Sequence, residues 1–521
     1  MRTPILSELI RYTDTKAYPF HMPGHKRRFL DFDKNIYELD VTEISGMDEM
    51  HDPKEIIRES MDCLKEVYGT KESFYLVNGS TGGILAAIFA AIHKKDGILV
   101  ARNCHKSVYH AIELCRATPI FLYPKWKEEY DFYGEISPKK VEKILSRNGK
   151  IKAMVFTSPT YEGIVSDVKR ISEICRKYGV LCIVDEAHGA HLPFASKAGN
   201  FPKSAITLGA DLVIQSLHKT LPSLTQTAIL HVPVGSRVNL ERLRHYLTVF
   251  QTSSPSYVFM GAMERCVNFM EQEGKELWSQ YESLLDEFYR SLQGKEEQGL
   301  MYFRLYQGEK AFGFDKGKII ISTKNTPFSG ADLAECLRGK YQIEIEMEAA
   351  TYVIAMTSLM DDKEGFVRLK QALLSIEEGF RTESGVGKGN LNGELASNEN
   401  KEIGSREHKG IESREHKGIG SNEHKKLGSK GFKIPKAKRR CSVKKALKMP
   451  GEVVSLKECK GRISKDYVFV YPPGIPVLTP GDGISKEIRD LLLKYIDLGL
   501  NVKGVYDDKK IKVLTEGLEN G

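Results

Sequence analysis

Residues 211–220 read Asp-Leu-Val-Ile-Gln-Ser-Leu-His-Lys-Thr, an apolar run that ends in a polar cluster with a lysine. The run predicts a buried strand that leaves the core at Gln215 and places Lys219 in a loop at its end. Such a lysine becomes a nucleophile when burial or a nearby cation lowers its pKa, because only the neutral amine attacks a carbonyl. Most lysines after strands are solvated, so a Schiff-base role for Lys219 requires a cofactor site elsewhere in the chain.

The stretch belongs to a longer alternation of short apolar strands and amphipathic helices. Strands are predicted at 74–77, 98–101, 119–123, 153–157, 181–184, 212–214 and 228–232. Helices with apolar residues at helical spacing are predicted at 83–92, 106–116, 137–146 and 167–178. This alternation predicts an α/β domain with a mainly parallel central sheet.

Polar side chains directly follow five of the predicted strands. They lie at 78–81, at Asn103 and His105, at 158–162, at Asp185 and His188, and at 216–219. The carboxyl ends of parallel strands share one edge of a sheet, where ligands bind. A helix cap or a turn explains each cluster alone, whereas five convergent clusters predict a binding site.

The residue types in these clusters indicate the ligand. Residues 79–83 read Gly-Ser-Thr-Gly-Gly and open a helix after a strand, so backbone N–H groups, two hydroxyls and the helix dipole predict a phosphate site. Residues 185–188 spell the DEAH box of helicases, but the chain has no G-x-x-x-x-G-K-[ST] loop, which excludes a helicase. Asp185 instead suits a protonated ring nitrogen. A phosphate site, an aspartate and a lysine together predict pyridoxal phosphate.

Several histidines allow more than one interpretation. His105 is predicted either to stack on the cofactor ring or to cap the helix at 106–116. His188 and His191 stand three residues apart, but two ligands without a third give weak support for a metal. Residues 21–26 read His-Met-Pro-Gly-His-Lys. The Pro-Gly pair explains a turn there, but it does not explain the two histidines. No metal is expected.

Composition limits the class of protein. A chain of 521 residues is expected to form two or three domains. No apolar stretch reaches the roughly 18 residues of a membrane span, and the first residues lack the apolar core of a signal peptide. The nine cysteines contain no C-x-x-C pair, which argues against a disulfide framework and a thiolate zinc site. A reduced, cytoplasmic protein is expected.

One polar region accounts for the basic charge. Residues 425–448 hold eleven Lys or Arg and no Asp or Glu, and subtracting them from +8 leaves −3 for the rest. Before them, residues 397–428 form four copies of an eight-residue repeat too polar to bury a core. Repeat expansion explains the spacing of His408, His416 and His424 without a metal. The basic run lacks interleaved aromatic residues, which favours a solvated linker over nucleic-acid binding.

The chain is thus predicted to have five regions. They are an N-terminal segment with an active-site loop (1–50), a cofactor-binding large domain (51–290), the first part of a small α+β domain (291–381), a disordered linker (382–450), and the second, C-terminal part (451–521). A strand, helix, strand, strand, helix pattern between 300 and 380 supports the small domain.

Eight motifs occur in order: HMPGHK, NGSTGG, RNCHKS, TSPTYEG, VDEAHGAH, QSLHKT, TSSPSY and YPPGIPVLTPGD. As a set they resemble the Orn/Lys/Arg decarboxylase family, pyridoxal-phosphate enzymes with the aspartate-aminotransferase fold, fold type I. The resemblance covers residues 19–257 and 468–486. HMPGHK begins about twenty residues into the chain, which is similar to the short form of the family, often linked with polyamine synthesis.

The resemblance implies a set of cofactor-binding residues. Lys219 would carry pyridoxal 5′-phosphate as an internal aldimine, His105 would stack on its ring and Asp185 would bind the ring nitrogen. The residues implied around the phosphate and the aldimine are Ser80, Thr81, His188, Ser216 and His218. Ser253 or Ser254 would come from a second subunit, which implies a homodimer or higher even oligomer with shared active sites.

The implied activity is decarboxylation of arginine, lysine or ornithine, with arginine slightly preferred, to CO2 and agmatine, cadaverine or putrescine. Lys219 or His218 is expected to protonate the carbon that loses CO2. His25 and Asp482 are candidate substrate-binding residues, although the family usually has glutamate in place of Asp482, so substrate length is not decided. No membrane or nucleic-acid partner is expected.

Two alternatives remain open from the residues. One is another fold-type I enzyme, an aminotransferase or lyase; an aminotransferase normally needs an arginine that holds the substrate carboxylate, and the sequence does not place one. The other is a non-catalytic protein that binds the cofactor and a partner.

Overall fold

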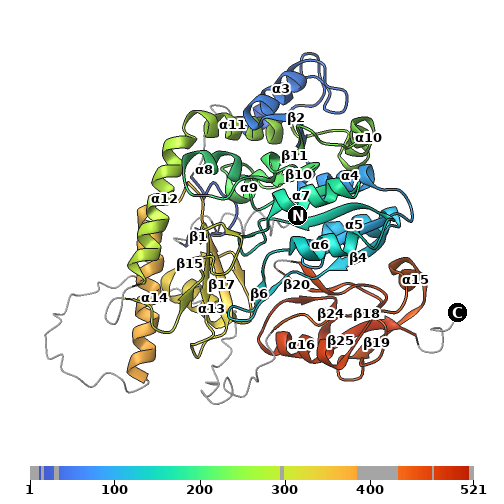
Figure 1. Ribbon diagram of the computed structural model, residues 1–521. Coiled ribbons are helices and arrows are strands. Elements are labelled where there is room, and N and C mark those ends of the chain that lie inside the picture. Colours follow the sequence, from blue (N-terminus) through green and yellow to red (C-terminus); the bar gives the residue numbers. More distant parts are fainter. Residues whose placement is uncertain are drawn as a thin grey trace, which may run out of the picture.

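The structure, a computed structural model, describes residues 11–12, 17–28, 35–293, 299–383, 432–471 and 474–515. Its large domain is built on a seven-stranded sheet with the order β2-β11-β10-β9-β7-β3-β4 (Figure 1). The strands are β2 (Thr70–Leu76), β3 (Gly97–Ala101), β4 (Thr118–Leu122), β7 (Ile151–Thr157), β9 (Leu181–Asp185), β10 (Leu212–Ser216) and β11 (Ala228–Pro233). Strand β11 is antiparallel to both neighbours, and the remaining pairs are parallel. The predicted fold class, including the mainly parallel sheet, is confirmed.

The helices of the large domain are α3 (Ile56–Tyr68), α4 (Gly79–Ala91), α5 (Lys106–Cys115), α6 (Pro138–Leu145), α7 (Val168–Lys177), α8 (Leu192–Ala198), α10 (Leu240–Phe250) and α11 (Tyr257–Gln272). The four helices predicted at 83–92, 106–116, 137–146 and 167–178 are present as α4, α5, α6 and α7. Helix α4 is apolar around most of its circumference and is largely buried, as expected of a helix without a solvent face. Side-chain caps set several helix starts: Asp167 accepts from Arg170 N before α7, and Ser256 accepts from Phe259 N before α11.

The end of β10 differs from the prediction. Gln215 and Ser216 are buried members of the strand, and the lysine lies in a short helix, α9 (Leu217–Thr220), rather than in a loop. Gln215 stays in the core because both ends of its amide have partners: Nε2 donates to Glu186 at 2.7 Å, and Oε1 lies 3.2 Å from His231 Nε2. A polar residue with satisfied hydrogen bonds does not end a buried strand.

The small domain contains a four-stranded sheet with the order β12-β14-β17-β16. Its elements are β12 (Arg304–Leu305), β14 (Lys318–Ser322), β16 (Met347–Glu348), β17 (Tyr352–Met356), α12 (Gly274–Ser291), α13 (Gly330–Tyr341) and α14 (Lys363–Glu383). The predicted strand over residues 343–348 is interrupted at Glu346. Its first part, β15 (Ile343–Ile345), pairs in parallel with β1 (Tyr18–Phe20), and β16 pairs with β17.

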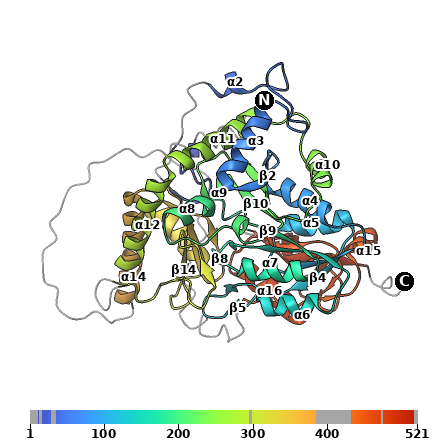
Figure 2. The same ribbon diagram turned by 45° about the horizontal axis from the view of Figure 1, so that its top comes forward.

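The C-terminal residues form a domain of their own. Its elements are β18 (Lys438–Arg439), α15 (Val443–Lys448), β19 (Gly451–Ser455), β20 (Val468–Val470), β21 (Ile475–Leu478), β22 (Asp482–Gly483), α16 (Lys486–Asp497), β23 (Val502–Lys503), β24 (Val505–Tyr506) and β25 (Lys510–Leu514). Most of its buried apolar residues form a separate cluster. Figures 1 and 2 both place this domain beside the β4 edge of the large domain and away from α14. The prediction that 451–521 completes the small domain is therefore wrong.

The predicted disordered linker is also wrong over residues 432–450. Phe432 stacks on Tyr495, with ring centroids 5.9 Å apart, and β18 pairs with β22. Arg439 lies 3.2 Å from the buried carboxylate of Asp482. The basic side chains were misleading because they flank a few apolar and hydrogen-bonded positions that anchor the segment. The eight-residue repeats lie outside the described residues.

The remaining short elements are α2 (Ile36–Leu39), β5 (Trp126–Lys127), β6 (Phe132–Tyr133), β8 (Ile164–Val165) and β13 (Gly313–Phe314). In the part of the chain that the structure describes, no helix is long and apolar enough to cross a membrane.

Two deletions should separate the repeats from the anchored basic segment. Removing whole repeats within 397–428 is expected to leave activity and melting temperature near those of the intact protein, because so polar a segment contributes little apolar burial. Replacing 432–448 with a glycine-serine segment of equal length removes the β18–β22 pairing, α15 and the partner of Asp482. We expect that variant to unfold at a clearly lower temperature in a thermal melt. Equal melting temperatures for the two variants would contradict the assignment of 432–448 to the C-terminal domain.

Glu186 predicts a pH dependence of stability. Burial raises the pKa of its carboxyl group from 4.5 to about 7, although Ser204, Ala205 N and Gln215 donate hydrogen bonds to it. The folded state therefore binds more protons than the unfolded state between these pH values, so stability is present at low pH and is lost as pH rises towards 7. The contribution is roughly 3 kcal/mol. The decrease in melting temperature from pH 4.5 to 7.5 should be smaller in Glu186→Gln, and unchanged in the exposed control Glu59→Gln.

Candidate active site

Lys219 and Asp185 meet at the carboxyl ends of neighbouring parallel strands. Asp185 ends β9 opposite Ile214 of β10, and Lys219 follows in α9. The Nζ atom of Lys219 is 3.0 Å from Nε2 of His188. Burial lowers the pKa of Lys219, while the carboxylates of Asp185 and Glu346 raise it. The structure thus brings together the lysine, the aspartate and one histidine that the sequence predicted.

Asp185 is buried beneath this group, with 3% of its surface exposed. Its Oδ1 accepts a hydrogen bond from Ala187 N at 3.2 Å. Burial raises the pKa of the carboxyl group, and the positive charge of Lys219 opposes that increase. A buried carboxylate of this kind stabilises a cation or a protonated ring nitrogen placed against it.

His105 occupies the start of α5, next to the end of β3. Its Nδ1 accepts from Ser107 N at 3.3 Å and lies 2.9 Å from the Ser107 hydroxyl, so the predicted helix cap is present. Burial and then the charge of Lys219 lower the pKa of His105 to about 3, which keeps the ring neutral at physiological pH. Capping and ring stacking are compatible, because the cap uses only one edge of the imidazole.

Ser80 and Ser216 join two strand ends at the predicted phosphate site. Their hydroxyl oxygens are 2.6 Å apart, linking the first turn of α4 to the end of β10. Thr81 is exposed in the same turn. The first N–H groups of a helix have no partner within the helix, so this turn offers donors and a positive dipole end to an anion.

His218 lies beside Lys219, and a hydrogen bond to the backbone fixes which of its ring nitrogens carries the proton. Its Nδ1 is 3.0 Å from the carbonyl oxygen of Thr227 and donates to it. Burial lowers the pKa of His218 to about 4, against the effect of this hydrogen bond. The imidazole is therefore neutral near pH 7, and its other nitrogen is an acceptor.

The N-terminal motif packs directly against α9. Gly24 N donates to the carbonyl of His218 at 2.8 Å, and a Cβ atom at Gly24 would lie 2.8 Å from the carbonyl oxygen of Leu221. Only glycine fits this approach. His25 is half-buried and accepts from Arg27 N at 3.0 Å, and burial lowers its pKa. The turn predicted at 21–26 thus forms one wall next to the lysine.

Glu346 was not predicted as a residue of the site. This carboxylate accepts from Met22 N at 2.8 Å and from the hydroxyl of Tyr161, whose ring lies 4.5 Å from that of His188 between centroids. The segment 343–348 alternates apolar and acidic residues, so its glutamates resembled a solvated strand face. Tyr161 belongs to the TSPTYEG motif, which was a usable signal.

A loop of the C-terminal domain reaches His105. A Cβ atom at Gly474, whose φ is +84°, would lie 3.8 Å from the His105 ring. The YPPGIP motif therefore lies at the site, although Pro472 and Pro473 fall outside the described residues.

Asp482 lies outside the lysine cluster, the group formed by Lys219, Asp185 and His188. Its Oδ2 accepts from the backbone and the hydroxyl of Thr479, at 2.9 and 2.8 Å, and its Oδ1 pairs with Arg439. These contacts tie Asp482 into the C-terminal domain, which argues against the predicted substrate role.

Ser253 and Ser254 are exposed in the turn before α11. Their predicted contact with the cofactor depends on a second subunit and stays a prediction.

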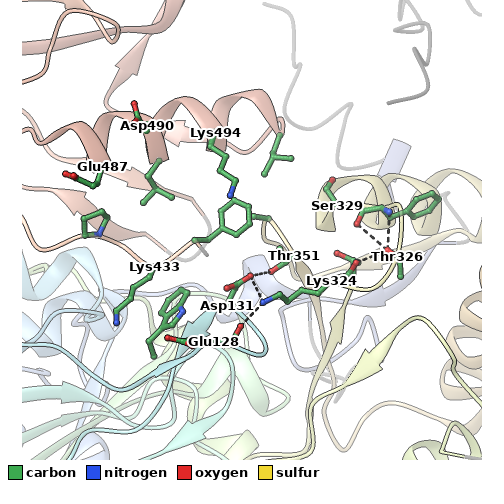
Figure 3. A pocket seen from close by; sticks show the side chains of 18 of the residues that line it. Glu128, Asp131, Lys324, Thr326, Ser329, Thr351, Lys433, Glu487, Asp490 and Lys494 are labelled. Carbon is green, nitrogen blue, oxygen red and sulfur yellow. Dashed lines mark hydrogen bonds and ion pairs between the residues drawn. The ribbon is translucent and has the colours of Figure 1, made fainter. Parts of the chain in front are cut away.

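A cavity of about 840 Å³ lies elsewhere, lined by residues of the large, small and C-terminal domains (Figure 3). Several of its charged groups are already partnered: Lys324 pairs with Asp131 at 3.1 Å and donates to the carbonyl of Glu128, and Lys494 lies 3.8 Å from the centroid of the Phe432 ring. The cavity does not contain the lysine cluster.

Comparison with known proteins identifies the family. Residues 3–310 match the Orn/Lys/Arg decarboxylase major domain, and residues 424–503 match its C-terminal domain. The chain belongs to the Orn/Lys/Arg decarboxylase family. The second match also includes residues 432–450, which the structure describes and which were predicted to belong to the linker.

Members of this decarboxylase family resemble the chain over nearly its full length. An arginine decarboxylase of Bacillus subtilis is 28% identical over 99% of the chain and 98% of its own length. An uncharacterized protein of the same organism, YaaO, is 32% identical over 99% of the chain and 98% of its own length. The solved structure of the Escherichia coli constitutive lysine decarboxylase superposes with a TM-score of 0.73, covering 99% of this chain and 82% of that one at 18% identity, and supports the fold.

Proposed function

We propose that the protein is a pyridoxal-phosphate-dependent decarboxylase of a basic amino acid, with arginine preferred to lysine and ornithine. The observation that carries the proposal is the buried pair of Lys219 and Asp185 at adjacent strand ends. The near full-length similarity to an arginine decarboxylase supports the choice of substrate class.

The residues present fit this cofactor. The first turn of α4, with the Ser80–Ser216 pair, offers donors to a phosphate. Asp185 offers a buried carboxylate to a ring nitrogen, and the Nδ1 atom of buried His188 has no partner in the described structure. Thr81, His105 and His218 lie on the elements around them, and Ser253 or Ser254 would complete the site from a partner subunit.

When bound, pyridoxal phosphate supplies an electron-withdrawing ring conjugated to the substrate's α-carbon. Asp185 would hold the proton on the ring nitrogen, and His105 would support the ring as a neutral imidazole. As CO2 leaves, the bond between the α-carbon and the carboxylate breaks, and its electron pair stays with the carbon until a proton arrives there.

Lys219 is the better of the two predicted proton donors. At neutral pH the depressed pKa of His218 leaves that residue without a proton to give on Nε2. Lys219, once its amine is free and protonated, carries a transferable proton beside the same carbon. The products are CO2 and agmatine, cadaverine or putrescine.

Incubating the purified protein with pyridoxal phosphate and each of arginine, lysine and ornithine tests the proposal. We expect CO2 and the matching amine from at least one substrate, with the highest kcat/KM for arginine. No CO2 from any of the three would contradict it, and keto acid without CO2 would indicate an aminotransferase instead.

We also propose that the protein acts in the cytoplasm as a homodimer or higher even oligomer with shared sites. The exposed position of Ser253 and Ser254 supports a contribution across an interface. Sedimentation of the cofactor-loaded protein tests the assembly, and a monomer with full activity would exclude shared sites.

A further inference from the structure

The ammonium group of Lys318 lies beside the proposed site and has no counter-ion among the described residues. Lys318 begins β14 and is 1% exposed. In the described ranges of the chain, its Nζ atom has no hydrogen-bond acceptor within 3.5 Å and no carboxylate within 4.0 Å. A buried unpaired ammonium is strongly unfavourable. An anion that the described part of the protein does not supply would stabilise it.

Lys26 shows what a structural buried lysine looks like in this protein. It is 4% exposed, and its Nζ donates to three backbone carbonyl oxygens at 2.6–3.0 Å. It also lies 3.8 Å from the carboxylate of Asp361. Lys26 is held by the fold, whereas Lys318 has no such partners in the part of the chain that the structure describes.

The carboxylates near Lys318 already have other partners. Asp315 lies 3.3 Å from His191 Nε2, and Glu346 accepts from Met22 N and the hydroxyl of Tyr161. The negative charges of Asp315 and Glu346 still raise the pKa of Lys318, although neither carboxylate forms an ion pair with it.

The position of Lys318 points to the lysine cluster. Its side-chain stem packs against Gly163, where a Cβ atom would lie 2.9 Å from Lys318 Cγ, and Gly163 follows Tyr161 in the same motif. The charges of both Lys219 and Lys318 lower the pKa of His188, after burial. Burial lowers the pKa of Lys318 to about 8, with Asp315 and Glu346 raising it and Lys219 and Lys26 lowering it. The group thus remains mostly protonated at neutral pH.

We propose that Lys318 binds the α-carboxylate of the substrate amino acid. This inference rests on the proposed function, which supplies two anions to the site. The phosphate has its donors at Ser80 and Ser216, on the sheet side. The substrate's distal group is a cation, so its α-carboxylate is the remaining anion, and Lys318 meets it from the small domain.

A lysine suits this task in a decarboxylase. Arginine binds a carboxylate through two parallel hydrogen bonds, whereas the ammonium group of lysine is a compact charge on a flexible side chain. Lys318 can therefore orient the bond that breaks without holding the carboxylate in two places as CO2 departs.

Lys318→Met, which keeps the length and removes the charge, tests the proposal. For the amino acid that the intact protein decarboxylates, KM should increase at least about 30-fold. The dissociation constant of the amine product, which lacks the carboxylate, should change less than about twofold when measured by titrating the cofactor absorbance. The melting temperature should stay the same or rise, because a desolvated charge is removed. Lys318→Arg should recover part of the lost affinity.

Lys316→Met is the matched control. Lys316 lies two residues away and is partly buried, paired with Glu282 and Asp286 at 2.8 Å. The Lys316→Met variant should keep the KM for the amino acid and the dissociation constant of the amine product unchanged. The proposal is overturned if Lys318→Met keeps the KM of the intact protein, or if affinity for amino acid and amine falls equally. An intact protein that decarboxylates none of the three amino acids would instead overturn the proposed function.

Discussion

Lys219→Ala is expected to abolish decarboxylation and the visible absorbance of the lysine-bound cofactor. The loss in kcat should be at least about 1,000-fold, because the variant lacks both the covalent attachment point and the proton donor. The protein should remain folded with an unchanged or higher melting temperature, since the amine that it loses is desolvated beside His188. Steady-state assays, absorbance spectra and a thermal melt measure the three effects.

The control for this variant is Lys316→Met, which removes a lysine outside the site. It should keep both the absorbance and the activity. If Lys219→Ala retained a lysine-bound spectrum, another amine, such as that of Lys318 or Lys26, would be the attachment point, and the assignment of Lys219 would be wrong.

Asp185→Asn is expected to lower kcat at least about 100-fold while the cofactor stays attached to Lys219. Asparagine has the same shape and keeps the acceptor for Ala187 N, but it has no charge to hold a proton on the ring nitrogen. The visible spectrum of the bound cofactor should persist. The ring should withdraw electrons from the substrate less strongly. Single-turnover release of CO2 measures the chemical step directly.

Glu186→Gln is a close control for Asp185→Asn. The neighbouring carboxyl group bonds to Ser204 and Gln215 in the core rather than to the site. It should keep kcat within about threefold of the intact protein. An Asp185→Asn variant with normal kcat would show that the ring nitrogen needs no buried carboxylate here.

Much of the large domain was predictable because its signals are local. Short apolar runs between amphipathic helices mark the parallel strands, and polar residues placed after them mark one edge of the sheet. Lys219, Asp185, His105 and Ser80 were found in this way. Lys318 was missed because a charged residue at the start of an apolar strand usually points to solvent.

The C-terminal domain was harder to predict. Lys438 and Arg439 read as part of a solvated run, yet they form a strand against Asp482 and Gly483, more than forty residues later. Such a pairing leaves little trace in local composition, because long-range hydrogen bonds can order a segment with few apolar residues.

The sequence by itself determined the fold class, the family and the lysine, aspartate and histidine at the strand ends, since periodicity and turn residues act over a few positions. Only the tertiary structure decided which charges surround them. Glu346 reaches Met22 because β15 pairs with β1 across the chain. Among the described residues Lys318 has no ion-pair partner, because the nearby carboxylates are engaged elsewhere. Burial and pairing of a charge depend on every element packed around it, and that information is not local.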